Sequence, residues 1–229
     1  MTQSTSSLQQ HPAIWRASDT LKHTEIARLN TGYDALNTIL SGGFPAAGLA
    51  RIRTLLGIGE ISALKLLISR NPHQKLLVFI NPPGKIHKSW LADLGQTSNT
   101  VYVVYCATPE QTLWTAEQCI KSEACYLVLM WHLAIEPKQA RRLQVAAAQH
   151  DTLCLLYESF SHQYNALPVA LDIELQPAGN GLRITVHKNI GSWPGQSTQI
   201  TFKHTPDNQA IYRAMNNTVA LQALSAQVG

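Results

Sequence analysis

The fold is decided by residues 49–69, which read LARIRTLLGIGEISALKLLIS. The run Leu49–Leu56 is mostly apolar and includes β-branched side chains, which predicts a strand. Gly57 and Gly59 interrupt this run, and Ile61–Ser69 has the apolar spacing of a helix. A strand, a glycine turn and a helix in this order predict an α/β unit.

The same alternation continues along the chain. Apolar runs predict strands at 76–80, 100–105, 126–131 and 152–157, and helical spacing predicts helices at 88–94, 109–122 and 137–149. In the last of these helices we expect Ala140, Leu143, Val145 and Ala147 to face the core. Continuous apolar strands separated by helices are typical of a mostly parallel sheet covered on both faces. The sequence therefore predicts a doubly wound α/β fold.

The pattern changes after residue 165. Residues 171–176 and 182–187 alternate apolar and polar side chains on either side of a glycine-containing turn at 178–181, which predicts a C-terminal β-hairpin extension. A further strand is expected near 199–202. We divide the chain into an N-terminal arm (1–28), a core domain (29–205) and a C-terminal helix or tail (206–229).

Composition and cysteine spacing exclude several classes of protein. The 229 residues are 45% hydrophobic and only 14% charged, which is the composition of a folded chain and not of a disordered one. The four cysteines form no CxxC pair, so no zinc site is expected. The first residues lack the charged and apolar regions of a signal peptide, and no run of 18 apolar residues occurs. We therefore expect a cytoplasmic protein without a membrane-spanning segment.

Positive charge is concentrated in one part of the chain. The formal net charge is +4, but residues 51–90 hold seven Lys and Arg side chains against a single carboxylate. This segment predicts weak, salt-sensitive contact with DNA phosphates through Arg51, Arg53, Lys85 and Lys88. A solvated basic surface without a partner is the other interpretation.

The glycine turn lies where a P-loop is found in nucleotide-binding α/β proteins, yet the residues that hold phosphate are missing. A P-loop ends in Gly-Lys-Ser/Thr, because the lysine neutralises phosphate oxygens and the hydroxyl binds Mg²⁺. Here Gly57 and Gly59 are followed by Glu60 and Ile61, and the strand at 126–131 ends in Trp131 without a carboxylate. We therefore predict a degenerate P-loop at a non-functional nucleotide site, with no cofactor, no metal and no enzymatic activity.

Several blocks resemble one protein family. Residues 29–37 (LNTGYDALN) and 41–45 (SGGFP) resemble the entry to a RecA-type core, which implies a RecA-like sheet. Residues 57–60 (GIGE), 79–83 (FINPP), 113–118 (LWTAEQ), 124–125 (AC) and 141–147 (RRLQVAA), in this order, resemble ImuA, an accessory protein of translesion DNA synthesis. The resemblance covers residues 11–203, and the SulA cell-division inhibitors are a shorter related group.

The resemblance implies a non-catalytic protein of the SOS response to DNA damage. Its expected partners are ImuB, an inactive relative of Y-family polymerases, and ImuC, an error-prone polymerase, with RecA and nucleoid DNA as further contacts and self-association as an open question. One alternative is a SulA-like inhibitor that binds FtsZ. The other is a residual DNA-stimulated ATPase in which Lys65 or Lys85 replaces the missing lysine.

Exposed aromatic and basic positions are the candidates for partner contacts. Trp114 and the basic side chains Lys138, Arg141 and Arg142 lie on two predicted helices, and Ile211 and Met215 belong to an apolar stripe in the predicted C-terminal helix. Packing of Trp114 against a neighbouring helix, a solvated basic helix face and a C-terminal helix packed in the core remain the alternatives.

Overall fold

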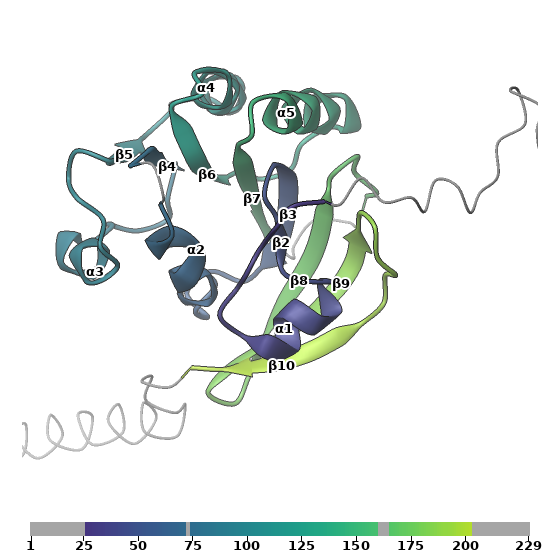
Figure 1. Ribbon diagram of the computed structural model, residues 1–229. Coiled ribbons are helices and arrows are strands. Elements are labelled where there is room, and N and C mark those ends of the chain that lie inside the picture. Colours follow the sequence, from purple (N-terminus) through teal and green to yellow (C-terminus); the bar gives the residue numbers. More distant parts are fainter. Residues whose placement is uncertain (1–25, 72–73, 160–164, 203–229) are drawn as a thin grey trace, which may run out of the picture.

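A mixed eight-stranded sheet forms the centre of the protein (Figure 1). The computed structural model describes residues 26–71, 74–159 and 165–202. The strand order is β10-β9-β8-β3-β7-β6-β4-β5, and a separate pair joins β1 (Arg28–Leu29) to β2 (Phe44–Pro45). The strands of the large sheet are β3 (Gly48–Thr54), β4 (Leu76–Ile80), β5 (Val101–Val104), β6 (Cys125–Trp131), β7 (Leu153–Ser159), β8 (Leu171–Ala178), β9 (Gly181–Asn189) and β10 (Ser197–Thr201).

Six neighbouring strands of this sheet, from β8 to β5, run parallel, and β9 and β10 are added antiparallel. The interior strands are buried along nearly their whole length, which explains why β6 (CYLVLMW) and the first part of β7 (LCLLY) read as continuous apolar runs. Strands β8 and β9 pair from Leu171↔Asn189 to Ala178↔Gly181. The predicted α/β fold with a mostly parallel sheet is therefore confirmed.

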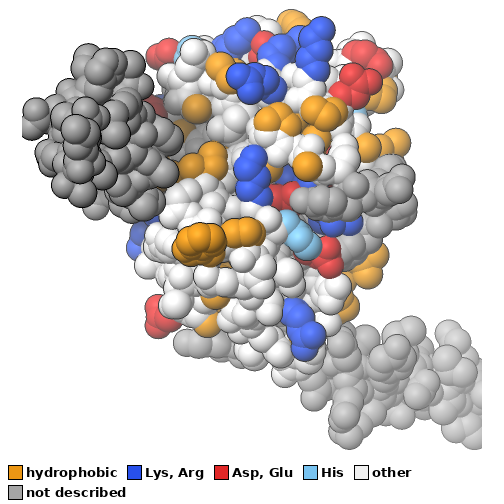
Figure 2. All heavy atoms as spheres, turned by 90° about the vertical axis from the view of Figure 1, so that its right-hand side faces the viewer, with side chains coloured by type: hydrophobic (Ala, Val, Ile, Leu, Met, Phe, Trp, Pro, Cys, Tyr) orange, Lys and Arg blue, Asp and Glu red, His pale blue; other side chains and the backbone are white. Residues whose placement is uncertain are grey.

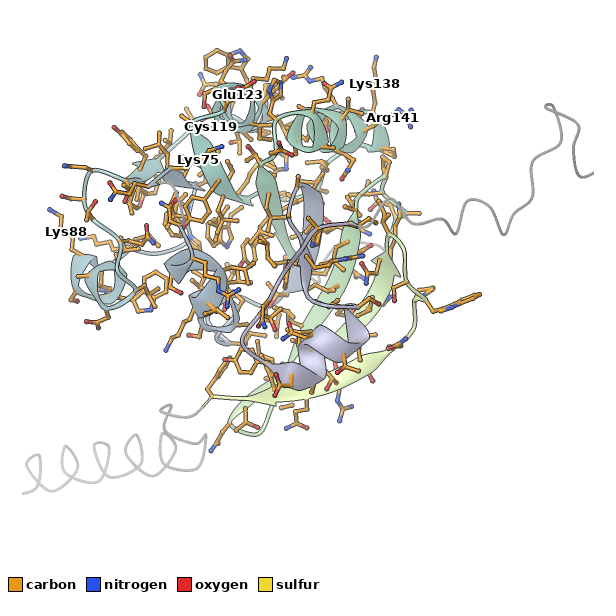
Figure 3. All side chains as sticks on the ribbon, in the orientation of Figure 1. Lys75, Lys88, Cys119, Glu123, Lys138 and Arg141 are labelled. Carbon is orange, nitrogen blue, oxygen red and sulfur yellow. The ribbon has the colours of Figure 1, made fainter. Side chains whose placement is uncertain are left out.

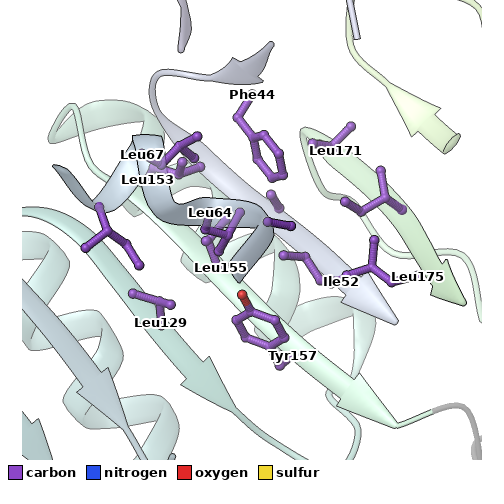
Figure 4. Close-up of a cluster of buried hydrophobic side chains, with 14 of the residues drawn as sticks. Phe44, Ile52, Leu64, Leu67, Leu129, Leu153, Leu155, Tyr157, Leu171 and Leu175 are labelled. Atoms are coloured by element: carbon purple, nitrogen blue, oxygen red, sulfur yellow. The ribbon is translucent and has the colours of Figure 1, made fainter. Parts of the chain in front are cut away.

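Helices cover both faces of the sheet (Figure 1). On one face, α1, α2 and α3 pack over a cluster that includes Phe44, Ile52, Leu129 and Tyr157 (Figure 4). On the other face, α4 and α5 pack over a second cluster that includes Leu49. The helices are α1 (Asp34–Ile39), α2 (Lys65–Ser69, preceded by a 3₁₀ turn at Ser62–Leu64), α3 (Lys88–Asp93), α4 (Pro109–Lys121) and α5 (Pro137–Gln149).

The two long helices begin at residues suited to that role. The Thr108 hydroxyl accepts a hydrogen bond from the Gln111 amide at the start of α4, and Glu136 and Gln139 form a capping box at the start of α5. In each helix a proline occupies the first position, where no amide donor is needed. Helix α5 buries Ala140, Leu143, Ala146 and Ala147, whereas Val145 is exposed, so the expectation that Val145 faces the core is wrong.

Residues 1–25 of the predicted N-terminal arm (1–28) and the whole predicted C-terminal segment (206–229) lie outside the described residues, which end at Phe202. The candidate contacts Ile211 and Met215 belong to that second segment. In the described ranges, no helix is both long and apolar enough to cross a membrane.

Candidate functional site at the carboxyl edge of the sheet

The carboxyl ends of β3, β7, β6 and β4 lie side by side at one edge of the parallel sheet. Open α/β sheets bind their ligands at this edge, because the loops that follow the strands converge there. The glycine turn follows β3, Trp131 ends β6, and Asn81 to Gly84 follow β4. The two segments in which the sequence lacks nucleotide-binding residues, the glycine turn and the end of β6, therefore meet at this edge together with the segment that follows β4.

The loop of residues 57–60 is held by its own glutamate. Backbone amides of Gly57 and Gly59 each donate a hydrogen bond of 3.1 Å to the Glu60 carboxylate, one to each oxygen. Both glycines have positive φ, and Glu60 is only 4% exposed. A Cβ on Gly59 would stand 2.5 Å from the Phe202 ring, so no larger residue fits there without movement. In this loop the carboxylate binds amides of the kind that hold phosphate in a P-loop.

Trp131 belongs to an aromatic stack at the end of the sheet. Because Trp131 lies beside Tyr157 in the register of β6 and β7, their rings stack with centroids 4.6 Å apart and planes 6° apart. Phe79 of β4 lies on the far side of Trp131, at 6.4 Å. Ile61 packs against the same apolar cluster. The strand end that would need a Mg²⁺-binding carboxylate is thus filled by apolar rings.

Asn81 stabilises the end of β4 through hydrogen bonds. Its backbone has φ of +52°, its side-chain amide donates to the Thr112 hydroxyl at 2.9 Å, and its carbonyl oxygen accepts from the Cys106 amide at 2.7 Å. The end of β4 is therefore tied both to α4 and to the segment after β5.

The prediction that Arg51 contacts DNA is wrong. Arg51 is 1% exposed, and its guanidinium donates to the Asp172 carboxylate and to the Asn165 side chain and carbonyl. Arg51 Nη1 also lies 3.5 Å from Glu158 Oε2, which makes a second ion pair. Arg53 is largely buried as well and pairs with Glu174 at 3.3 Å. Both arginines pair with carboxylates of the neighbouring strands β7 and β8, because a charge removed from solvent needs a partner.

The two lysines of the predicted phosphate contacts are exposed. Lys85 lines a cavity of about 420 Å³ together with Gly57 and Glu60, so it lies beside the glycine loop. Lys88 begins α3 and lies away from α5 in Figure 3. Lys65 lines a different cavity, with Tyr33 and Phe202. The basic residues at 51–90 therefore do not form one surface.

A second candidate surface is the outer face of α4 and α5, which we call the α4–α5 surface. Trp114 is 60% exposed on it, so the alternative of Trp114 packed against a neighbouring helix is wrong. Lys138 and Arg141 extend from α5 into solvent (Figure 3), and Lys and Arg side chains gather at the top of Figure 2, over this helix. Arg142 and Lys121 both bind Glu117, and the Lys121 hydrogen bond is the main cause that lowers the pKa of that carboxyl.

The chain matches no family model, and no curated protein is detectably similar to it. Among the described residues, no group of three or more His, Cys, Asp or Glu side chains has an arrangement that could hold a metal ion. Glu158, Asp172 and Tyr157 were not predicted from the sequence as residues of this edge. The first two are charged residues within otherwise apolar or alternating strands, and that was the available signal for a buried ion pair with Arg51.

Proposed function

We propose that this chain is a non-catalytic adaptor in SOS-induced, error-prone translesion DNA synthesis. In this role it bridges an inactive Y-family polymerase relative of the ImuB type and an error-prone polymerase of the ImuC type in the cytoplasm, at the nucleoid. The pathway and the partners come from the resemblance of the sequence blocks to ImuA. The strand order β8-β3-β7-β6-β4-β5, with the glycine loop after β3, supports a RecA-like form of the α/β fold with a degenerate P-loop.

The position of Glu60 is the main support for the proposal that the chain does not hydrolyse nucleotides. Its carboxylate accepts hydrogen bonds from the two glycine amides at 3.1 Å, so a phosphate at the loop would compete with a tethered anion. Trp131 adds a second obstacle, because an aromatic ring stands at the strand end where Mg²⁺ would need a carboxylate. Both features favour a scaffold that has given up nucleotide hydrolysis.

The α4–α5 surface supports the adaptor part. An exposed Trp is a frequent anchor in protein interfaces, and an Arg next to it adds planar hydrogen-bonding capacity. Trp114 stands on α4, and Arg141 and Arg142 stand on the adjacent α5. We assign the contact with one of the two polymerase-type partners to this surface.

The test is recovery of partners from DNA-damaged cells on the tagged full chain in moderate salt, identified by mass spectrometry. We expect both polymerase-type proteins with the wild type, a loss of at least tenfold with Trp114→Ala, and no loss with Trp193→Ala, which removes an 83% exposed Trp from the β9–β10 connection. Recovery of FtsZ without polymerases would instead support the SulA-like alternative. DNA-stimulated phosphate release that disappears in Lys85→Ala would contradict the non-catalytic assignment and support the ATPase alternative.

A further inference from the structure

The large sheet ends on one side in β5, and the outer edge of this strand has no partner strand (Figure 1). Within the described residues, β5 pairs with β4 alone, in a regular parallel register. Three large apolar side chains in and just after this strand are exposed: Tyr102 by 53%, Val103 by 40% and Tyr105 by 66%. An unpaired edge strand with apolar side chains is a site at which another chain can add a strand.

The backbone hydrogen bonds of β5 show which residues face outward. The Thr100 carbonyl accepts a hydrogen bond from the Leu77 amide at 2.8 Å, and the Val104 carbonyl accepts one from the Asn81 amide at 2.9 Å. Because a strand is pleated, alternate residues direct their amide and carbonyl groups to opposite sides. The even-numbered residues from 100 to 104 therefore bond to β4, and the odd-numbered ones turn these groups to the open side. The outward-facing residues are Val101, Val103 and Tyr105.

The two edges of the sheet differ in their chemistry. The opposite edge strand, β10, reads STQIT and is polar except for Ile200, which is buried. Residues 101–105 read VYVVY, without charge, proline or glycine, and their register with β4 has no bulge. Charged side chains, prolines and bulges are features that keep an edge strand from pairing with another chain. Because β5 has none of these features, its edge favours association.

The helices leave space beside β5. On one face, α4 packs mainly over β6 and β4, inward from the edge. On the other face, Val101 packs against the cluster under α1, α2 and α3. Val103 points to the same face two residues later and is 40% exposed, so the helices do not cover it. The outer side of Val103 is therefore accessible to a further strand.

The order of the side chains fits a second copy of the same strand. When two β5 strands pair antiparallel around Val103, this residue faces its own copy and Val101 faces Tyr105, so each outward-facing residue meets another. Tyr102 then lies opposite Val104. Every cross-strand pair combines β-branched or aromatic side chains, and such pairs stabilise a sheet. No charges meet in this pairing, and a two-fold axis through the centre makes it a closed dimer.

We propose that β5 is a self-association surface, at which two copies of this chain join their sheets by antiparallel pairing of residues 101–105. The outward-facing residues are placed symmetrically about Val103, and this symmetry selects a second copy as the occupant of the edge. The paired segment is short, so the dimer is weak, with a dissociation constant in the micromolar range or above. The inference does not depend on the polymerase-binding role, because β5 lies outside the α4–α5 surface.

The test is sedimentation velocity of the full chain at increasing concentrations, up to about 1 mM, where weak association is still detected. We expect the wild type to change from monomer to dimer. Val103→Lys places two like charges directly opposite each other at the two-fold axis, so we expect the dissociation constant to rise by about tenfold or more. The matched control is Ser197→Lys, which puts the same charge on an exposed residue of β10 and is expected to leave the dissociation constant unchanged.

A charge swap at Val103 separates the symmetric pairing from any other contact. Val103→Asp alone is expected to stay monomeric, because like charges again meet at the axis. An equal mixture of Val103→Lys and Val103→Asp brings opposite charges face to face, so we expect dimers to return in the mixture. Circular dichroism with a cooperative thermal transition shows that each variant is folded, as expected for a substitution at a 40% exposed edge residue.

Three results would overturn the proposal. The first is a wild-type chain that stays monomeric at the highest concentration. The second is a folded Val103→Lys variant that dimerises as tightly as the wild type. The third is a mixture of the two charged variants that stays monomeric although the wild type dimerises, because the two Val103 side chains would then not lie opposite each other.

Discussion

Replacement of Glu60 tests the self-held glycine loop directly. The Glu60→Ala variant removes both acceptors of the Gly57 and Gly59 amides, and each hydrogen bond to a charged group contributes about 1.5–3 kcal/mol to stability. Gly57 is exposed, so its amide can return to water and its share is small. The Gly59 amide is half-buried and carries most of the loss. We therefore expect the free energy of unfolding to fall by about 2 kcal/mol.

The Glu60→Gln variant refines the same prediction. A glutamine keeps one acceptor oxygen and places an NH₂ group where the second oxygen was, so one of the two hydrogen bonds is lost. We expect a loss of about 1 kcal/mol. In a chain of this size, 1 kcal/mol corresponds to a melting-temperature decrease of roughly 2–4 °C.

The assay is thermal and urea unfolding followed by circular dichroism. The matched control is Asp93→Asn, which neutralises an exposed carboxylate at the end of α3 and is expected to change stability by less than about 0.5 kcal/mol. If Glu60→Ala were as stable as this control, the carboxylate would not be holding the loop, and the argument against phosphate binding would lose its main support.

Three further predictions concern other parts of the molecule. Arg51→Ala leaves Asp172 and Glu158 buried without their cation, so we expect the free energy of unfolding, measured in urea, to fall by about 3–5 kcal/mol. A variant that is as stable as the wild type but binds DNA more weakly would contradict this prediction. Trp114→Ala is expected to change the melting temperature by less than 2 °C, because its side chain is exposed, and a larger decrease would show that it packs in the fold. Burial raises the pKa of Glu158, although the nearby Arg51 opposes this shift. The folded state therefore binds the Glu158 proton more tightly than the unfolded state does. The stability that this proton contributes is fully present below pH 4.5 and is lost as the pH rises through the raised pKa. The stability difference between wild type and Glu158→Gln, measured by urea unfolding from pH 4 to 8, should therefore shift in favour of the variant as pH rises, and a constant difference would refute the prediction.

The sequence predicted the sheet well because its interior strands are buried on both faces. Runs such as 127–131 and 153–156 are apolar throughout, and this pattern separates parallel interior strands from amphipathic ones. The prediction of which helix residues face the core was less accurate. Val145 was expected to face the core, but it is exposed. It lies two positions after Leu143 and two before Ala147, and on a helix of 3.6 residues per turn this separation places its side chain on nearly the opposite side.

The candidate site was predicted only in part. Spacing placed Glu60 in the glycine loop, but the two amide hydrogen bonds depend on backbone angles that composition does not fix. The roles of Arg51 and Arg53 were misread, because a local count of charge does not reveal that Asp172 and Glu174, more than 100 residues later, lie beside them. Long-range strand register decides which basic residues are exposed.

The position of β3 also has a consequence for synthesis of the chain. Both neighbours of this strand, β7 and β8, are made about 100 or more residues after it. At ribosomal rates of roughly 5–20 residues per second, β3 stays without a partner strand for about 5–20 s. During that time the apolar segment Leu49–Ile52 is exposed to aggregation or to chaperone capture. We expect a nascent chain stopped before residue 150 to be held by chaperones, and one extended past residue 178 to be released.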